Sequence, residues 1–314
     1  MGHFIIRRLL LMVPVLIGVS VIVFLLMRVI PGDIALLLAG DSATEQRLEE
    51  IRQELGLKKP LYQQYAEWVW GACRLDFGKS MWSGEPVFSE IARRFPLTLQ
   101  LALMTTIITV VISIPVGVIC AIRQDSAKDY VLRVFAISGL SMPSFWIGIL
   151  IIMALVAAFK WAPPLGYVNI WEDPFKNFQI LIWPALAVGF RQAAIQARMS
   201  RSCMLDVLRQ DYIRTAWAKG LREKTVIIRH ALKNALLPII TIIGVEFAFL
   251  LGGLVVTEAV FTLPGLGRYL VDAIHHRDYN VIQAIVLIMA VFVSFANLAV
   301  DVIYGWVDPR VRYQ

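Results

Sequence analysis

The chain has 314 residues, of which 58% are hydrophobic and 17% charged, and its formal net charge is +7. Soluble domains contain about 45–50% apolar and about 25% charged residues, so this chain is more apolar than one soluble core requires. The composition excludes intrinsic disorder, and three cysteines in a chain of this length exclude a disulfide-rich secreted domain. The sequence therefore predicts an integral membrane protein.

Six stretches are long and apolar enough to cross a bilayer as helices, which takes about 20 mostly apolar residues. The first ends in Arg-Val-Ile-Pro-Gly and not in the small residues of a signal-peptide cleavage site, so we expect it to be retained. The fourth, which starts at residue 180, is the weakest because Arg191, Gln192 and Gln196 interrupt it before Arg198. The other predicted spans are 9–30, 97–122, 134–159, 235–260 and 281–306.

The distribution of charge predicts that both termini are cytoplasmic. The termini and the loops on their side hold 17 Lys and Arg in 75 residues, whereas the two short loops on the opposite side hold four in 39. Short loops rich in Lys and Arg stay inside, so the positive charge indicates orientation and not nucleic-acid binding. The segments predicted to be cytoplasmic are 1–8, 123–133, 191–237 and 306–314.

The long segment 31–96 is predicted to be extracytoplasmic and helical. Ser42-Ala-Thr-Glu45 has the pattern of a capping box, and Pro60 can open a second helix. The apolar stripe of this second helix is either a docking surface for a soluble partner or a face that packs on the membrane domain. Gly78-Lys79-Ser80 has the ending of a phosphate loop, but Cys73 stands where that loop needs glycine. We therefore expect no ATP site in this chain.

The segment from Arg191 to Leu237 carries ten Lys and Arg residues against three acids. Its apolar residues follow helical spacing in two stretches, and Gly220 between them allows a sharp turn. The pattern predicts two short helices along the inner membrane surface. They either bind anionic lipid headgroups or form a lever that fits into a cytoplasmic partner.

Two blocks of this sequence carry a family resemblance. Arg214-Thr-Ala-Trp-Ala-Lys-Gly-Leu221, followed by His230-Ala-Leu-Lys-Asn-Ala-Leu-Leu-Pro238, resembles the loop of binding-protein-dependent ABC importer permeases, in the dipeptide, oligopeptide and nickel branch. Only Ala216 and Gly220 match the general Glu-Ala-Ala-x-x-x-Gly pattern of the wider family. Glu258-Ala-Val-Phe-Thr-Leu-Pro-Gly-Leu-Gly-Arg268 also resembles that branch. Shorter matches extend the resemblance over nearly the whole chain.

The resemblance implies an all-α membrane protein with six transmembrane helices and the type I ABC importer permease fold, in the bacterial inner membrane. It implies four kinds of partner: a homologous second permease, two ABC ATPases, an extracytoplasmic substrate-binding protein and the lipid bilayer. ATP and Mg²⁺ then act on the ATPases, with no cofactor or metal in this chain. The loop that couples the permease to the ATPases falls on Arg214, Thr215, Ala216, Lys219, Gly220, Leu221 and Arg222.

The candidate cargo path consists of ionisable and polar residues inside spans, which are costly there and by default functional. Arg191 departs from the apolar residue expected of the family. It either binds an anionic cargo group, pairs with Glu246, or snorkels toward the end of its helix. Glu258 either shapes the outer gate or meets a cationic group of the cargo, or it is tied to a neighbouring basic or backbone group. Asp301 is expected to pair with an arginine. His275-His276 is too weak a signal for a metal site. The candidate path residues are Arg191, Gln192, Gln196, Glu246 and Glu258.

The expected function is a permease subunit that imports di- or oligopeptides. Nickel complexes, glutathione, or a modified sugar or opine are the alternative cargoes. A stand-alone secondary transporter would show an inverted repeat, and a membrane enzyme would show a clustered catalytic motif; neither stands out. The predicted organisation is a first span in 1–30, the outer loop in 31–96, a permease core in 97–306 with its coupling loop at 199–237, and a tail at 307–314.

Overall fold

The computed structural model describes residues 2–29, 44–54, 56, 58–164 and 166–307, which form helices and one isolated antiparallel bridge, between Lys79 and Pro86. In chain order the α-helices are α1 (Gly2–Val29), α3 (Glu45–Glu54), α4 (Leu61–Cys73), α5 (Val87–Ile122), α6 (Ala127–Ser141), α7 (Ser144–Phe159), α8 (Pro174–Leu208), α9 (Asp211–Ala218), α10 (Glu223–Thr225), α11 (Lys233–Gly253), α12 (Val255–Val260), α13 (Leu266–His275) and α14 (Tyr279–Val307). A π-helical turn, Val226–Leu232, leads into α11.

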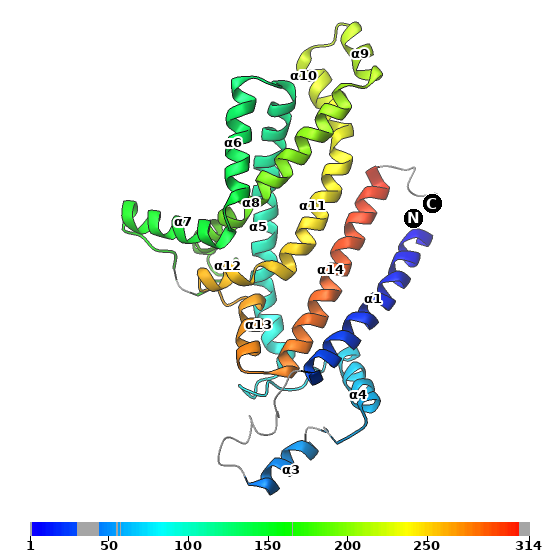
Figure 1. Ribbon diagram of the computed structural model, residues 1–314, viewed down its shortest axis with the longest axis vertical. Helices are drawn as coiled ribbons and strands as arrows, with labels where there is room; N and C mark the ends of the chain where they lie inside the picture. Colours follow the sequence, from blue (N-terminus) through cyan, green and yellow to red (C-terminus); the bar gives the residue numbers. More distant parts are fainter. Residues whose placement is uncertain (1, 30–43, 55, 57, 165, 308–314) are drawn as a thin grey trace.

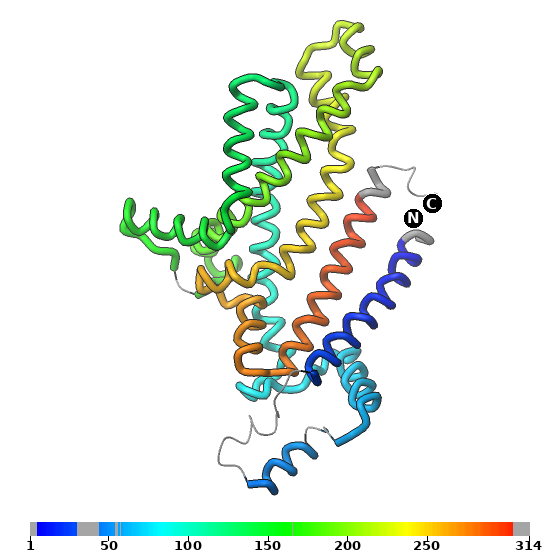
Figure 2. Tube along the Cα trace, in the orientation of Figure 1, coloured from blue at the N-terminus to red at the C-terminus, as the bar shows by residue number. Residues whose placement is uncertain are grey.

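The long helices run side by side, with α9 and α10 at one end of the molecule and α3 and α4 at the other (Figure 1). Five helical segments are long and apolar enough to cross a membrane, and α6 with α7 make a sixth if the bent pair is one span. This confirms an all-α membrane fold with five or six candidate spans among the described residues. In Figure 2 the coloured parts of α1 and α14 nearest the chain ends extend toward the end of the molecule that carries α9.

The predicted third span, 134–159, is wrong as a single helix. The chain forms α6 and α7, which are bent by 103° relative to each other. Pro143 causes the break, because a proline ring pushes the residue before it out of the helical region. Met142 accordingly has φ −106° and ψ 130°. Helix α7 therefore leaves the bundle sideways (Figure 1).

The fifth predicted span, 235–260, is also shorter than expected at its end. Helix α11 stops at Gly253, and the short helix α12 carries the chain on in a new direction. Two consecutive glycines, which are poor helix formers, stand at this end. The fourth predicted span, by contrast, is part of a longer helix than expected, because α8 continues through Arg191 as one helix of 35 residues.

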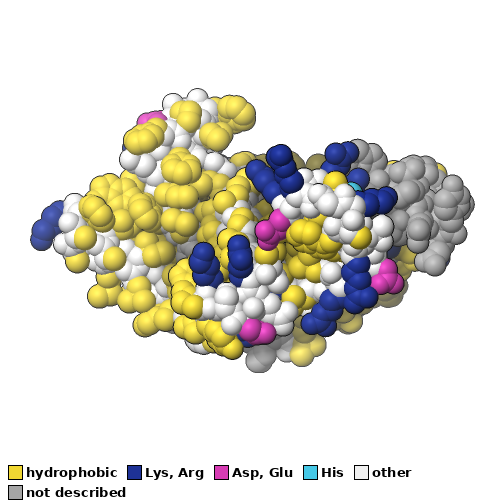
Figure 3. All heavy atoms as spheres, turned by 90° about the horizontal axis from the view of Figure 1, so that it is seen from above, with side chains coloured by type: hydrophobic (Ala, Val, Ile, Leu, Met, Phe, Trp, Pro, Cys, Tyr) yellow, Lys and Arg dark blue, Asp and Glu magenta, His cyan; other side chains and the backbone are white. Residues whose placement is uncertain are grey.

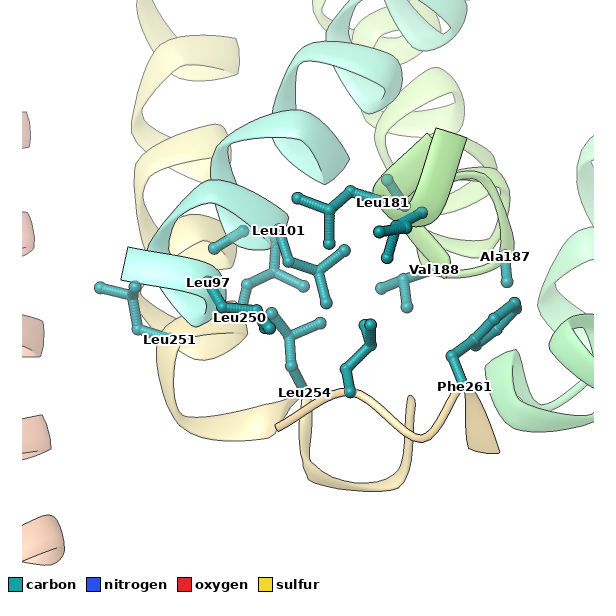
Figure 4. Close-up of a cluster of buried hydrophobic side chains, with 13 residues drawn as sticks. Leu97, Leu101, Leu181, Ala187, Val188, Leu250, Leu251, Leu254 and Phe261 are labelled. Atoms are coloured by element: carbon teal, nitrogen blue, oxygen red, sulfur yellow. The ribbon is translucent and has the colours of Figure 1, made fainter. Parts of the chain in front are cut away.

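The central core forms where α5 and α8 pack along their lengths and α11 closes over them. Figure 4 shows leucines of α5, α8 and α11 pointing toward one another, with Phe261 approaching from the loop after α12. Helix α8 starts cleanly because Asp173 caps it, its side chain accepting a hydrogen bond from the Lys176 amide at 2.9 Å. This rigid pair sets the positions of the polar residues on α8.

Helix α1 is attached through α14 and α4. Asp301 on α14 forms an ion pair with Arg8 at 3.1 Å, which confirms that this aspartate pairs with an arginine. At the other end the Ser20 and Tyr65 hydroxyls lie 2.8 Å apart, and the rings of Phe24 and Tyr65 pack edge to face. The apolar stripe of α4 thus packs on the membrane domain. Of the predicted capping box, Ser42 lies outside the described residues.

The close packing of α11 on α14 depends on Gly244, because a Cβ atom there would collide with the Val300 side chain. Replacing Gly244 with leucine is expected to lower the free energy of unfolding by about 1–3 kcal/mol, the usual cost of overpacking. In the purified protein the melting temperature should fall by at least about 2 °C. Gly252→Leu is the matched control, because nothing lies within 4 Å of a Cβ at Gly252. Equal melting temperatures for the two variants would contradict this packing.

Candidate functional site

The predicted coupling loop contains a short helix, α9, anchored to the bundle by its buried side. Ile213 is 1% exposed and Ala216 is 6% exposed. They pack in a cluster with residues of α8, the π-helical turn and α11, namely Met204, Val226, Ile227, Ala231, Ala235 and Ile239. Tyr212 also accepts a hydrogen bond from Asn234 Nδ2 at 2.9 Å. Helix α9 is therefore fixed to α8 and α11.

The turn after α9 depends on the backbone of Gly220. Its φ is +73°, a left-handed value that glycine adopts without penalty. The Gly220 amide donates to the Trp217 carbonyl at 2.9 Å, and the Leu221 amide donates to the Ala216 carbonyl at 3.4 Å. A Cβ atom at Gly220 would meet nothing within 4 Å, so conformation and not space requires glycine here.

Six of the seven predicted coupling residues are exposed; only Ala216 is buried. Viewed toward the α9 end, Lys and Arg side chains stand around apolar patches (Figure 3). Arg214 pairs with Asp211 at 3.5 Å, but both are largely exposed, so the pair adds little stability. Tyr212 and Trp217 are 43% and 46% exposed and add aromatic surface beside the predicted residues.

The predicted path residues of α8 lie at different depths. Gln196 is fully buried, and its Nε2 donates to the Ile239 carbonyl of α11 at 3.3 Å, while its Oε1 is buried without a hydrogen bond. Arg191 and Gln192 are partly exposed on the same helix, as is Glu246 on α11. Within the described residues no ion pair joins Arg191 to Glu246. Pairing with Glu246 is therefore not the arrangement that Arg191 adopts in this structure.

Glu258 is placed differently from the other path residues, since it is fully buried in a corner between α5, α12 and α13. Its Oε1 accepts from the Thr98 hydroxyl at 2.7 Å, and its Oε2 accepts from the Arg268 amide at 3.0 Å. The Leu266 amide donates in turn to Thr98 Oγ1 at 2.9 Å. Gly265 lies directly against the carboxylate, where a Cβ would collide with it. Glu258 therefore holds the α12–α13 corner onto α5.

A second buried carboxylate, Asp129 at the start of α6, was not among the predicted site residues. It is fully buried, and its Oδ2 lies 2.9 Å from Arg133 and 3.1 Å from Arg201 of α8. Its backbone amide donates to Ser126 Oγ at 3.3 Å, so the spacing Ser-x-x-Asp was a local signal for this helix start. Its pairing with Arg201, which is distant in sequence, had no such signal.

At the opposite end, the loop before α5 is tied to the loop before α14. Asp278 is 2% exposed and accepts hydrogen bonds from the Ser80 hydroxyl and from the Trp82 amide, the latter at 3.3 Å. The Trp82 ring stacks on the His276 imidazole with 3.9 Å between centroids.

Burial, with the nearby charges of Asp278 and Glu90, raises the pKa of Tyr269 to about 12. This phenol therefore stays neutral at physiological pH.

Comparison with known proteins assigns the family. Residues 113–313 match the family described as binding-protein-dependent transport system inner membrane component, and residues 1–102 match the N-terminal model of such membrane components. The chain is 40% identical over 338 residues to the dipeptide transport system permease protein DppB of Escherichia coli (strain K12), and 42% identical over 314 residues to the glutathione transport system permease protein GsiC of the same strain. Each alignment covers 100% of both proteins.

A solved structure shares the fold. An inward-facing structure of the MetNI methionine ABC transporter matches with a TM-score of 0.56 and 18% identity, over 69% of this chain and 96% of that one. At 18% identity this similarity supports only the fold. The role as a permease subunit is supported by the family match and by the two full-length relatives. The chain therefore belongs to the binding-protein-dependent transport system inner membrane components, as a multi-pass permease subunit of an ABC importer and not an ATP-hydrolysing subunit.

Proposed function

We propose that this permease imports short peptides delivered by an extracytoplasmic binding protein. The observation that carries the proposal is the identity of 40–42%, over the full length, to permeases named for dipeptide and glutathione transport. Glutathione is itself a small peptide, so both relatives favour cargo with a peptide backbone over nickel complexes, sugars or opines. Binding calorimetry on the cognate binding protein tests this, with a dipeptide, a longer peptide and glutathione as ligands. Binding of none of the three contradicts the proposal.

The proposed assembly joins this chain to a homologous second permease and to two ABC ATPases, which bind and hydrolyse ATP with Mg²⁺. In this arrangement the end of the molecule that carries α9 faces the cytoplasm. The excess of Lys and Arg in the loops at this end supports that orientation. The outer loop and the α12–α14 corner then face the binding protein.

The coupling surface is proposed to consist of Arg214, Thr215, Lys219, Leu221 and Arg222 around the Gly220 turn. Their exposure leaves them available to a partner, while Ile213 and Ala216 fix α9 to α8 and α11. A movement imposed on α9 by the ATPases therefore reaches both helices that carry the predicted path residues. Helix α9 thus acts as a rigid lever between ATPase and membrane.

The cargo path is proposed to include Arg191, Gln192, Gln196 and Glu246 on the facing helices α8 and α11. Arg191 is the most informative of them, because a guanidinium hydrogen-bonds well to a peptide carboxylate. Glu258 was also predicted as a path residue. Since its hydrogen bonds hold the α12–α13 corner, we assign it to the support of the path and not to cargo contact.

Replacing Arg191 with alanine is expected to reduce uptake of dipeptides by about tenfold or more, because a hydrogen bond to a charged group contributes about 1.5–3 kcal/mol. The uptake of labelled dipeptide into proteoliposomes with the assembled transporter measures this. Arg191→Lys keeps the charge and should retain part of the activity. Lys176→Ala, in the exposed first turn of α8 and outside the coupling loop, is the control for loss of a cation. Unchanged uptake with unchanged cargo preference in Arg191→Ala contradicts a role in cargo binding.

A further inference from the structure

A cavity of about 410 Å³ lies between α5, α6 and α8, and none of the seven predicted coupling residues or the predicted path residues lines it. Three arginines line it, Arg133 on α6 and Arg198 and Arg201 on α8. Two carboxylates lie beside them: Asp129, which pairs with Arg133 and Arg201, and Asp125, which lies 3.7 Å from Arg133. Three arginines against two carboxylates leave the site with an excess of positive charge.

These arginines retain free hydrogen-bonding capacity. Each guanidinium has five N–H donors, so the pairing of Arg133 and Arg201 with Asp125 and Asp129 leaves several donors unused. The Nε atoms of Arg133 and Arg201 are buried and make no hydrogen bond. Arg198 is exposed and forms no ion pair with any described residue. Buried donors without a partner are costly, which favours an anionic acceptor in this cavity.

The deeper wall of the cavity is apolar. On α6 the cavity is lined by Arg133, Ala136, Ile137 and Leu140. At a rise of 1.5 Å per residue, Leu140 lies about 10 Å further along the helix than Arg133. On α8 the same order holds, since Ala194 lies one turn deeper than Arg198. The cavity is therefore charged near the ends of the helices and apolar toward the middle of the membrane.

The mouth of the cavity borders the outward face of α6, where Val131, Val134 and Ile137 are at least 60% exposed. In a membrane protein an exposed apolar helix face meets acyl chains. A phospholipid in the adjacent leaflet has the same polarity order as the cavity, with its phosphate at the surface and its chains toward the midplane. A free phosphate would leave the apolar wall without a partner.

We propose that this cavity binds an anionic phospholipid, with its phosphate on Arg133, Arg198 and Arg201 and an acyl chain along Ala136, Ile137 and Leu140. Basic pockets between membrane helices are known to bind anionic headgroups, which supports this chemistry. The inference concerns the lipid-facing side of α6 and stands independently of which cargo the permease carries. The lipid would join α6 to α8 at the end from which α9 extends.

Native mass spectrometry of the purified transport complex tests the proposal, with dioleoyl-phosphatidylglycerol and dioleoyl-phosphatidylcholine added in parallel. Phosphatidylglycerol should bind more tightly. Arg198→Gln should weaken its binding about fivefold, as expected for one basic group near the membrane surface. Arg198 lies outside the Asp129 ion pairs, so this change leaves that cluster intact. Arg209→Gln, on the same helix but outside the cavity, should leave lipid binding unchanged.

A second variant tests the apolar part of the cavity. Ala136→Trp fills the space proposed for an acyl chain, and should remove the preference for phosphatidylglycerol. Its melting temperature in phosphatidylcholine should equal that of the wild type if the protein folds normally. Equal binding of both lipids to the wild type, or no effect of either cavity variant, overturns the proposal.

Two further measurements test whether the cavity instead binds a soluble anion or contacts the second permease subunit. Inorganic phosphate and glycerol phosphate at millimolar concentration should not displace phosphatidylglycerol; displacement would show a soluble-anion site and contradict a lipid site. A cysteine placed at Ala136 should not cross-link to the second permease subunit. A cross-link would show that this face is a subunit interface, which also contradicts the proposal.

Discussion

Replacing Gly220 with proline is expected to abolish ATP-driven uptake while the permease remains folded in the membrane. Proline fixes φ near −65°, whereas Gly220 has φ +73°, and proline also removes the amide that donates to the Trp217 carbonyl. The turn after α9 therefore cannot form, and Lys219, Leu221 and Arg222 lose their positions on the coupling surface. The proteoliposome assay should show background uptake, with the yield and melting temperature of the permease close to wild type.

Asparagine at the same position is the matched control for Gly220→Pro. Asparagine tolerates the left-handed region better than other non-glycine residues, so Gly220→Asn should retain most of the uptake. ATP hydrolysis measured with the same preparations separates coupling from assembly. We expect Gly220→Pro to lose the stimulation of hydrolysis by the loaded binding protein. Normal uptake by Gly220→Pro would show that this turn does not transmit the ATPase movement.

Replacing Glu258 with alanine is expected to destabilise the permease by about 3 kcal/mol or more. The change leaves the Thr98 hydroxyl and the Arg268 amide without their acceptor in a fully buried site, and each unsatisfied group costs about 1–3 kcal/mol. Glu258→Gln keeps one acceptor oxygen and should be intermediate. Thermal unfolding in detergent and the yield of monodisperse protein measure both effects.

The control for Glu258 is Glu85→Ala, because Glu85 is an exposed carboxylate on the same side of the molecule. It should leave the melting temperature unchanged. The experiment also separates the two interpretations of Glu258. A normal melting temperature with altered cargo preference in Glu258→Ala would return this residue to the cargo path and contradict its structural role.

Most of the helix pattern was accessible from the sequence, because each membrane span is specified by local composition. The difficulty was to tell which proline breaks a helix. Pro115 and Pro184 lie inside continuous helices, whereas the chain turns sharply at Pro143. Packing decides between these outcomes, since α5 and α8 support each other along their length while α7 departs from the bundle. No local property of the three prolines reveals this difference.

The site residues also fall into two groups: those that a local signal in the sequence predicts, and those whose role depends on partners far away in the chain. The Gly220 turn was predictable, because a glycine between two helical stretches is a local signal. Because an ionisable group inside a span is costly, Glu258 was predicted either to serve the cargo path or to be tied to a neighbouring basic or backbone group, and the Arg268 amide fits the second alternative. That cost is met by Thr98, which is 160 residues away in the chain. Asp129 and Arg201 likewise meet only in the folded protein. Sequence reasoning identifies such groups but not their partners.

The bend between α6 and α7 gives the subunit a horizontal arm. Helix α6 rises only about 22 Å at 1.5 Å per residue, less than the hydrocarbon thickness of about 30 Å. The uncharged helix α7 then extends about 24 Å sideways, with Ile149, Met153 and Phe159 facing outward. Because this arm is uncharged and lies across the direction of the bundle, tilting the subunit in a bilayer would move an apolar surface through the depth of the membrane.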